Sequence, residues 1–183
     1  MKTRLAIGLG AVSAAALLVA CGSLSGGKTL PPLALAPQVD LPRFMGDWWV
    51  IGSIPTVFEK GAHNARDSYR LDADGTIATT FSYLADSFDG AANEMHSRGF
   101  VLGPGNAVWG QQYVWPIKAD YRIAYVSSDY QLTVVGREKR DYVWIMARSQ
   151  SIAEADYARL AAFVAEQGYD VTKLQRAPQR PAR

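Results

Sequence analysis

Cysteine is almost absent from the sequence, because the 183 residues contain only Cys21. A chain with one thiol forms no internal disulfide and no thiolate zinc cluster, so its fold has to be stabilised by an apolar core. An excess of charge is also missing, with 19 Lys and Arg against 17 Asp and Glu. Lys2 and Arg4 account for the difference, and a balanced chain attracts nucleic acid poorly. We therefore predict no nucleic-acid partner.

Groups that carry catalysis or bind metals are equally scarce. His63 and His96 stand far apart in the sequence, and neither has a second histidine or a carboxylate at ligand spacing. Asp72 and Asp74 precede Gly75 as in the opening of a calcium loop, but the later ligands are missing, which favours a hairpin turn. The sequence thus predicts no metal, no cofactor and no enzymatic activity.

The first 20 residues are typical of an export signal. Lys2 and Arg4 precede an uncharged apolar run over residues 5–19. This run is shorter than the roughly 17 to 25 residues of a membrane span. We therefore predict a signal peptide over residues 1–20.

Residues 18–21, Leu-Val-Ala-Cys, resemble the lipobox of bacterial lipoprotein precursors. The resemblance implies cleavage before Cys21 and acylation of this residue, which would anchor the mature protein to a membrane. Gly22 stands where an aspartate would imply retention in the inner membrane, so the outer membrane is expected. The alternative is that Cys21 is an ordinary buried cysteine.

Two segments flank the expected folded domain, which covers residues 40–175. Residues 21–39 hold the expected lipidated terminus and a stretch rich in Gly, Pro and Ser, a composition that predicts a flexible tether. Residues 176–183 are rich in Pro and Arg and are predicted to form a basic, solvated tail.

Between these segments the chain falls into short runs of β-branched and aromatic residues separated by turn signals. The predicted strands cover residues 48–54, 67–71, 76–83, 95–102, 108–115, 121–126, 131–135 and 142–148. Hairpin-sized connections join them, so we predict an all-β fold, an eight-stranded antiparallel up-and-down β-barrel. Ser151 with Glu154 forms the pattern of a capping box, and the helical periodicity that follows ends at Gly168. This C-terminal α-helix should pack outside the barrel.

Three signatures resemble those of lipocalins, and each lies on the expected element. Gly46 and Trp48 open the first strand, Asp129 and Tyr130 occupy the turn before the seventh, and Arg148 closes the eighth. Residues 58–61, 141–148 and 167–171 further resemble the bacterial outer-membrane lipocalins and their apolipoprotein D-like relatives. The resemblance departs at Ser128, where threonine is usual.

The resemblance implies a membrane-anchored protein that binds, stores or transports lipids such as fatty acids or lysophospholipids. It implies a place in the bacterial outer membrane, on the periplasmic side, and a part in maintaining the envelope. It leaves homodimer formation open. At one end of the barrel we expect the Arg148 guanidinium to cover the Trp48 indole in a cation–π contact and to close that end.

Ligand contacts are expected from the inward face of the strands, where side chains two residues apart point the same way. The candidate ligand-binding residues are Phe81, Tyr83, Tyr113, Tyr121, Ile123, Tyr125, Trp144 and Met146. This apolar and aromatic set suits an acyl chain with a polar end.

Two alternatives remain open at this stage. One is an enzyme that acts on a lipid in the cavity, with Glu59, Tyr83 or Tyr121 as acid and base. The other is a structural envelope protein whose barrel is packed shut, since small barrels often fill their interiors with side chains.

Overall fold

The computed structural model describes residues 30–180, so the predicted signal peptide and Cys21 lie outside the described residues. The strands of the barrel are β1 (Gly46–Ile54), β2 (Ala62–Leu71), β3 (Ile77–Ala85), β4 (Ala92–Val101), β5 (Val108–Val114), β6 (Ile117–Val126), β7 (Leu132–Gly136) and β8 (Val143–Ala147). The remaining elements are α1 (Leu41–Phe44), α2 (Glu154–Glu166), the 3-10 turns Pro104–Asn106 and Val171–Lys173, and β9 (Gln175–Arg176).

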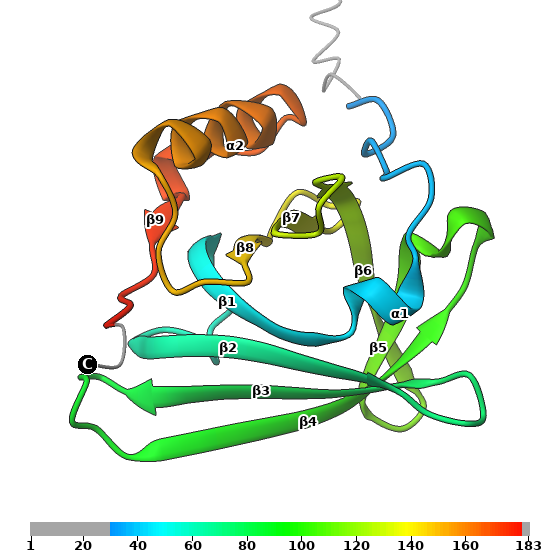
Figure 1. Ribbon diagram of the computed structural model, residues 1–183, viewed down its shortest axis with the longest axis horizontal. Coiled ribbons are helices and arrows are strands. Elements are labelled where there is room, and N and C mark those ends of the chain that lie inside the picture. Colours follow the sequence, from blue (N-terminus) through cyan, green and yellow to red (C-terminus); the bar gives the residue numbers. More distant parts are fainter. Residues whose placement is uncertain (1–29, 181–183) are drawn as a thin grey trace, which may run out of the picture.

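The strands close into a barrel. Each strand from β1 to β8 pairs antiparallel with the next, and β1 also pairs with β8. The short β9 pairs antiparallel with Gly52 and Ser53 of β1, beyond the point where the pairing of β1 with β2 ends. Figure 1 shows β2, β3 and β4 on one side of the molecule and α2 with β9 on the other. The prediction of an eight-stranded up-and-down barrel with a C-terminal helix is therefore confirmed.

Several strands are longer than predicted, most of all β2 and β6. Strand β2 begins at Ala62 instead of Asp67, and β6 begins at Ile117 instead of Tyr121. The added residues lie near the ends of the barrel strands, where backbone pairing continues although the side chains no longer alternate between core and solvent. Apolar periodicity reports the alternation of core and solvent faces, so it misses paired strand ends where a β-bulge, as in β2, or exposed side chains, as in β6, break that alternation.

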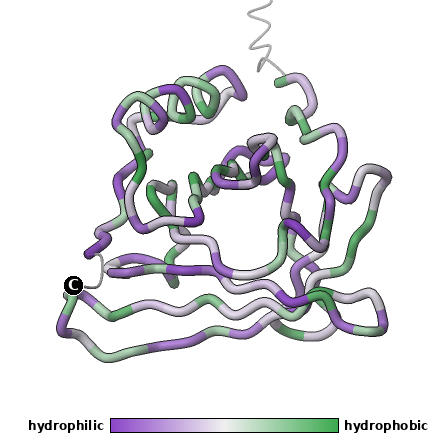
Figure 2. Tube along the Cα trace, viewed as in Figure 1, coloured by the Kyte–Doolittle hydropathy of each residue, from purple (hydrophilic) through white to green (hydrophobic). Residues whose placement is uncertain are grey.

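The apolar side chains form two layers, one inside the barrel and one between the barrel and α2. The inner layer includes Trp48, Ile77, Trp109 and Ile123, which are inaccessible to solvent. Figure 2 shows hydrophobic and hydrophilic residues interspersed along the strands, as expected where one face of a strand lines the interior and the other faces solvent. In the outer layer, Leu160 and Val164 of α2 pack on β7 and β8 among other residues. Burial of each such side chain contributes about 1.5–3 kcal/mol.

Helix α2 begins later than its sequence pattern predicts. Ala153 is the N-cap and provides no side-chain hydrogen bond, so the predicted capping box of Ser151 with Glu154 is wrong. The carboxylates of Glu154 and Asp156 in the first turn compensate, because they interact favourably with the positive end of the helix dipole. The helix ends before Gly168, whose φ of +87° is accessible at low cost only to glycine.

The tether prediction is wrong from residue 30 onward. Leu33, Ala36 and Val39 are buried, and the Ala36 amide donates to the Ile123 carbonyl. Their spacing of three matches the three residues per turn of a polyproline-type segment, so a Pro-rich stretch can still present one apolar side. Composition alone predicted flexibility because it ignores this spacing.

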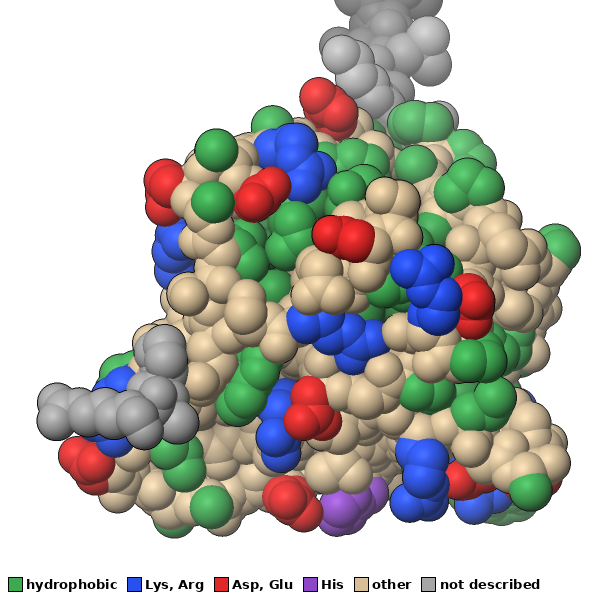
Figure 3. Space-filling model, in the orientation of Figure 1, with side chains coloured by type: hydrophobic (Ala, Val, Ile, Leu, Met, Phe, Trp, Pro, Cys, Tyr) green, Lys and Arg blue, Asp and Glu red, His purple; other side chains and the backbone are tan. Residues whose placement is uncertain are grey.

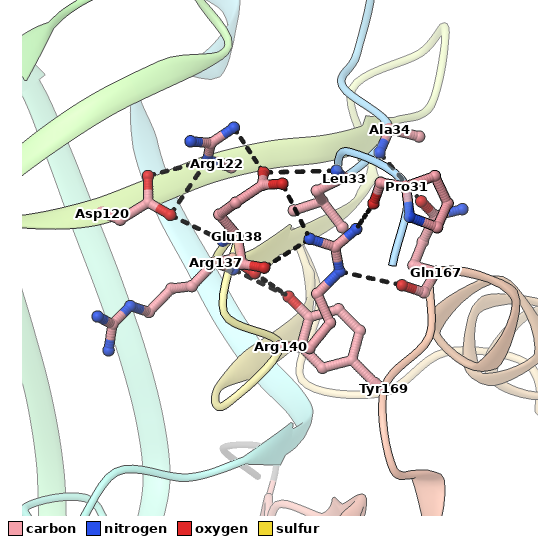
Figure 4. A network of polar contacts seen from close by, with 10 residues as sticks. All are labelled: Pro31, Leu33, Ala34, Asp120, Arg122, Arg137, Glu138, Arg140, Gln167 and Tyr169. Carbon is pink, nitrogen blue, oxygen red and sulfur yellow. Dashed lines mark hydrogen bonds and ion pairs between the residues drawn. The ribbon is translucent and has the colours of Figure 1, made fainter. Parts of the chain in front are cut away.

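A polar network attaches this segment beside the turn between β7 and β8 (Figure 4). The Arg140 side chain is 5% exposed and donates to the Pro31 carbonyl at 2.7 Å and to the Glu138 carbonyl at 2.6 Å. The Glu138 carboxylate forms an ion pair with Arg122 at 2.8 Å and accepts from the Leu33 amide. The network therefore holds the first described residues close to this turn.

We expect Arg140→Ala to lower the free energy of unfolding by about 1–3 kcal/mol, because the carbonyls of Pro31 and Glu138 lose a charged donor and the packing of the buried Arg140 side chain is lost. Urea unfolding measures the loss, and Lys139→Ala at the exposed neighbouring position is the matched control. Equal stability of the two variants would show that the network contributes nothing.

The tail is exposed at Arg176, Pro178 and Arg180, as predicted, but as far as Arg180 it is bound to the barrel and does not fray. Strand β9 pairs with Gly52 and Ser53, and the Gln179 side-chain amide donates to the carbonyls of Val50 and Ala65. Pairing between β1 and β2 ends at Trp49, so these carbonyls would otherwise lack a partner. The tail supplies their hydrogen bonds, a role that its composition does not reveal.

Basic and acidic side chains are interspersed over the face shown in Figure 3, with hydrophobic side chains between them. This agrees with the balanced composition of the chain. Within residues 30–180, none of the helices has the length and apolar character needed to cross a membrane.

Candidate functional site

One end of the barrel is sealed by a tryptophan and an arginine. The Arg148 guanidinium lies 3.8 Å from the centroid of the buried Trp48 ring. It donates to the carbonyls of Asp47 at 2.8 Å and Arg43 at 2.7 Å, while the Trp48 indole donates to the Phe44 carbonyl at 2.8 Å. We call this arrangement the floor. The expected cation–π contact is present, and hydrogen bonds to α1 add to it.

The other signature residues surround the floor. Gly46 has a φ of +89°, and a Cβ at this position would lie 3.5 Å from the Arg148 guanidinium. The Tyr130 hydroxyl accepts from the Asp40 amide at 2.8 Å, and its ring lies 4.1 Å from the Arg43 guanidinium. Asp129 accepts hydrogen bonds from within its own turn. The signatures, distant in sequence, thus form one structural unit.

The opposite end holds an apolar chamber of about 510 Å³, which we call the mouth chamber. This volume lies in the range of small-molecule sites. The interior is therefore not packed shut, unlike in the closed-barrel alternative. The lining comprises Thr56, Val57, Phe58, Glu59, Met95, Gln111, Tyr113, Val114, Ala119, Asp120, Tyr121, Arg137, Tyr142 and Trp144.

A smaller space of about 40 Å³, the deep pocket, shares six of these lining residues. Its own walls add Asp67, Tyr69, Thr79, Phe81 and Met146. Five of the predicted ligand-binding residues thus line one space or both, namely Phe81, Tyr113, Tyr121, Trp144 and Met146.

Tyr125 faces the wrong way for a ligand contact, so its predicted inward orientation is wrong. Ile123 is opposite Val135 whereas Tyr125 is opposite Val134, so Ala124 is an extra residue on β6. This β-bulge interrupts the alternation and turns Tyr125 outward, where its ring packs against Phe163 of α2.

Two further predicted contacts lie away from the two spaces. Ile123 faces inward as expected, but it is inaccessible to solvent and belongs to the inner core layer. Tyr83 packs on Phe81 with ring centroids 5.4 Å apart and lines neither the mouth chamber nor the deep pocket.

Glu59 joins the loop after β1 to the cavity wall. Its carboxylate accepts from the Thr56 amide at 2.7 Å and from the Trp144 indole at 3.0 Å. Burial raises the pKa of Glu59, and the hydrogen bonds from Thr56 and Trp144 oppose this rise. The contact fixes the indole that was expected to meet the ligand.

Asp67 is the functional candidate that the sequence analysis missed. Burial raises the pKa of its carboxyl to about 7, and the negative charge of Glu59 adds to the rise. Asp67 lies opposite Trp48 in β1 and Phe81 in β3, both inward-facing positions. Asp67 is two residues from both Ala65 and Tyr69, which face inward. This spacing could have indicated an inward-facing carboxylate.

We expect Asp67→Asn to stabilise the protein above neutral pH. The folded state binds the Asp67 proton more tightly than the unfolded chain does, so protonation of Asp67 favours folding. The stabilisation from this proton is lost as the pH rises from about 4 to about 7. The variant should gain about 2–4 kcal/mol at about pH 8 and almost nothing near pH 4. Urea unfolding at both pH values measures this. A gain in stability that is the same at both pH values would contradict the raised pKa of Asp67.

The chemistry of the site favours binding. The hydroxyls of Tyr69 and Tyr121 are 2.6 Å apart, and burial raises the pKa of both well above the usual range, which keeps them protonated. Of the acid–base residues in the enzyme alternative, Glu59 and Tyr121 line the cavity and Tyr83 does not. Among residues 30–180, no group of three His, Cys, Asp or Glu side chains could hold a metal ion.

A sealed floor, an antiparallel wall and an apolar chamber at the other end define a class of small barrels that hold one hydrophobic ligand. The chain belongs to the lipocalin family, since the lipocalin-like domain matches residues 39–179. Membership supports a role in binding a small hydrophobic ligand.

Curated relatives agree with this assignment. Temperature-induced lipocalin-1 of Arabidopsis thaliana is 30% identical over 148 residues, which cover 77% of this chain and 80% of the relative. Outer membrane lipoprotein Blc of Citrobacter freundii is 27% identical over 165 residues, which cover 90% of this chain and 91% of the relative. Blc of Escherichia coli strain K12 is 26% identical over 168 residues, with the same coverage.

Solved structures share the fold. Apocrustacyanin C1 superposes with a TM-score of 0.62 at 13% identity, covering 78% of this chain and 81% of its own. Insecticyanin from Manduca sexta superposes with a TM-score of 0.60 at 13% identity, covering 81% of this chain and 85% of its own. At these identities the likeness concerns the fold alone.

Proposed function

We propose that the protein binds single-chain lipids, the class that includes fatty acids and lysophospholipids, and stores or transports them to support the cell envelope. The mouth chamber carries the proposal, because its lining is mostly apolar and its volume is about 510 Å³. A chamber of this kind suits an alkyl chain better than a sugar or a nucleotide.

The energy of chain burial is sufficient for useful affinity. Each buried methylene contributes about 0.8 kcal/mol, so about ten of them give roughly 8 kcal/mol, near micromolar affinity. The loss of motional freedom on binding reduces this figure. Trp144, Tyr121 and Met95 line the wall of the mouth chamber, and an alkyl chain bound there would contact them.

We also propose that acylated Cys21 anchors the protein in the bacterial outer membrane, on the periplasmic side. The lipobox supports the anchor, and the relatives from Citrobacter freundii and Escherichia coli are named outer membrane lipoproteins. Arg137 and Tyr142, at the two ends of the β7–β8 turn, line the mouth chamber, and Pro31 is bound to Arg140 of the same turn. The chain that leads back to Cys21 would therefore leave the barrel beside its mouth.

Native mass spectrometry tests the lipid ligand. A chain that begins at Gly22 retains every described residue and carries no acyl chain of its own. When it is incubated with a lipid extract of bacterial envelopes and purified again without detergent, we expect a copurifying single-chain lipid. A protein that copurifies with no lipid and takes up none from micelles would refute the binding role. Loss of labelled palmitate incorporation in full-length Cys21→Ser tests the anchor separately.

A further inference from the structure

The deep pocket is rich in hydrogen-bond acceptors. The carboxyl of Asp67 forms no ion pair with any described residue and lines this pocket next to Glu59. Gln111 is 3% exposed, and its Nε2 donates to the Thr79 hydroxyl at 3.1 Å. The Gln111 Oε1 is buried without a hydrogen-bond partner. The carboxyls of Asp67 and Glu59 are therefore the main acceptors on the pocket wall, and a ligand that donates hydrogen bonds to them gains affinity.

Basic side chains of the wall point elsewhere. Arg98 pairs with Asp74, and the Lys118 ammonium lies 3.7 Å from the centroid of the Phe100 ring on the outside. Arg137 lines only the mouth chamber, and its guanidinium pairs with Asp141 at 3.2 Å. Thus no described basic side chain lines the deep pocket to neutralise its carboxylates.

We propose that the deep pocket receives the head group of the ligand and selects a head group that donates hydrogen bonds and carries no negative charge, a primary ammonium above all. This inference rests on the proposed function and narrows its ligand class from single-chain lipids in general to those with an uncharged or cationic head group. The volume of about 40 Å³ has room for an ammonium or hydroxymethyl group, because roughly 10–15 Å³ of such space holds one water molecule. The alkyl chain then extends through the mouth chamber.

A carboxylate head group is disfavoured in the same place. It would lie beside Asp67 and the Glu59 carboxyl, and like charges in a poorly solvated pocket repel strongly. An ammonium reverses the sign of this interaction and gains a charge-assisted hydrogen bond.

The preference should change with pH, since the pocket loses charge when Asp67 is protonated. The pKa of Asp67 is raised to about 7 by burial, so its charge forms as the pH increases through neutrality. The titratable or charged groups that line the connected spaces are Glu59, Asp67, Tyr69, Tyr113, Asp120, Tyr121, Arg137 and Tyr142, with His63 and Arg176 in the adjoining pocket behind Glu59.

Titration with three chain-matched probes tests the proposal. Dodecylamine, dodecanol and dodecanoate, all below their micellar concentrations, are added to the chain that begins at Gly22, and calorimetry gives each affinity. At about pH 8 we expect dodecylamine to bind at least about tenfold more tightly than dodecanoate, with dodecanol between them. At about pH 5.5, where Asp67 is protonated, the ratio should fall severalfold.

Two variants separate the charge from the fold. In Asp67→Asn we expect the preference for the amine to fall about tenfold while the dodecanol affinity is kept. Glu94→Gln, which removes an exposed carboxyl on β4, is the matched control and should keep the preference. If Asp67→Asn fails to fold, the pH dependence of the unaltered chain still decides.

The outcomes distinguish the two proposals. Equal affinity of the three probes, or tighter binding of dodecanoate at about pH 8, overturns the head-group inference and leaves lipid binding intact. Binding of none of the three overturns the proposed function itself.

Discussion

Replacement of Ala119 by tryptophan is expected to weaken the binding of a single-chain lipid at least about tenfold. Ala119 lines the mouth chamber on β6, opposite Gln111 of β5, so an indole there occupies the space of several methylenes. Each methylene excluded from the chamber removes about 0.8 kcal/mol of binding. Displacement of a bound fluorescent fatty probe measures the effect.

The control places the same side chain on the other face of the sheet. Ala78 of β3 lies opposite Arg70 and Arg98, which face outward, so Ala78→Trp adds an indole outside the barrel. The Ala78→Trp variant should bind as the unaltered chain does. Equal loss of binding in both variants, or no loss in either, would contradict a ligand in the mouth chamber.

Removal of the Trp48 side chain should lower the free energy of unfolding by about 3–5 kcal/mol. Trp48 is inaccessible to solvent, packs 5.0 Å from the Phe44 ring centroid, and supports the Arg148 guanidinium. The truncation leaves a cavity and deprives the guanidinium of its aromatic partner, which adds about 0.5–2 kcal/mol. Urea unfolding of Trp48→Ala measures the loss.

Trp49→Ala provides the comparison, because Trp49 is the neighbouring residue and faces outward. Its ring lies 5.3 Å from the Arg66 guanidinium and is only partly buried. We expect Trp49→Ala to cost no more than about 2 kcal/mol. If the two variants were equally stable, the floor would not be the main support of the closed end.

The barrel was predictable from sequence because it depends on short-range rules. Two-residue periodicity with hairpin turns places each strand next to its neighbour, and a closed barrel follows from the strand number. Gly46, Trp48 and Arg148 were predicted from their resemblance to lipocalin signatures, and the strand pairing brings them together at one end of the barrel. Trp144, Tyr121 and Phe81 follow from the same alternation.

The features that were missed depend on irregularity or on distant partners. The bulge at Ala124 inverts the facing of Tyr125, and nothing in the local composition of β6 marks it. Leu33 and Gln179 lie in segments that composition assigns to a tether and a tail, yet each packs on the barrel. The raised pKa of Asp67 depends on burial by several strands, and the residue pattern of one strand does not reveal such burial.

Contact quenching of Trp144 tests the central claim, a lipid chain seated in the mouth chamber, most directly. A fatty alcohol with a nitroxide on its chain is titrated into the unaltered chain and into Trp144→Phe, and tryptophan fluorescence is recorded. Quenching that saturates in the unaltered chain and largely disappears in Trp144→Phe is the predicted result. Absence of quenching, or the same quenching in both proteins, would contradict the account.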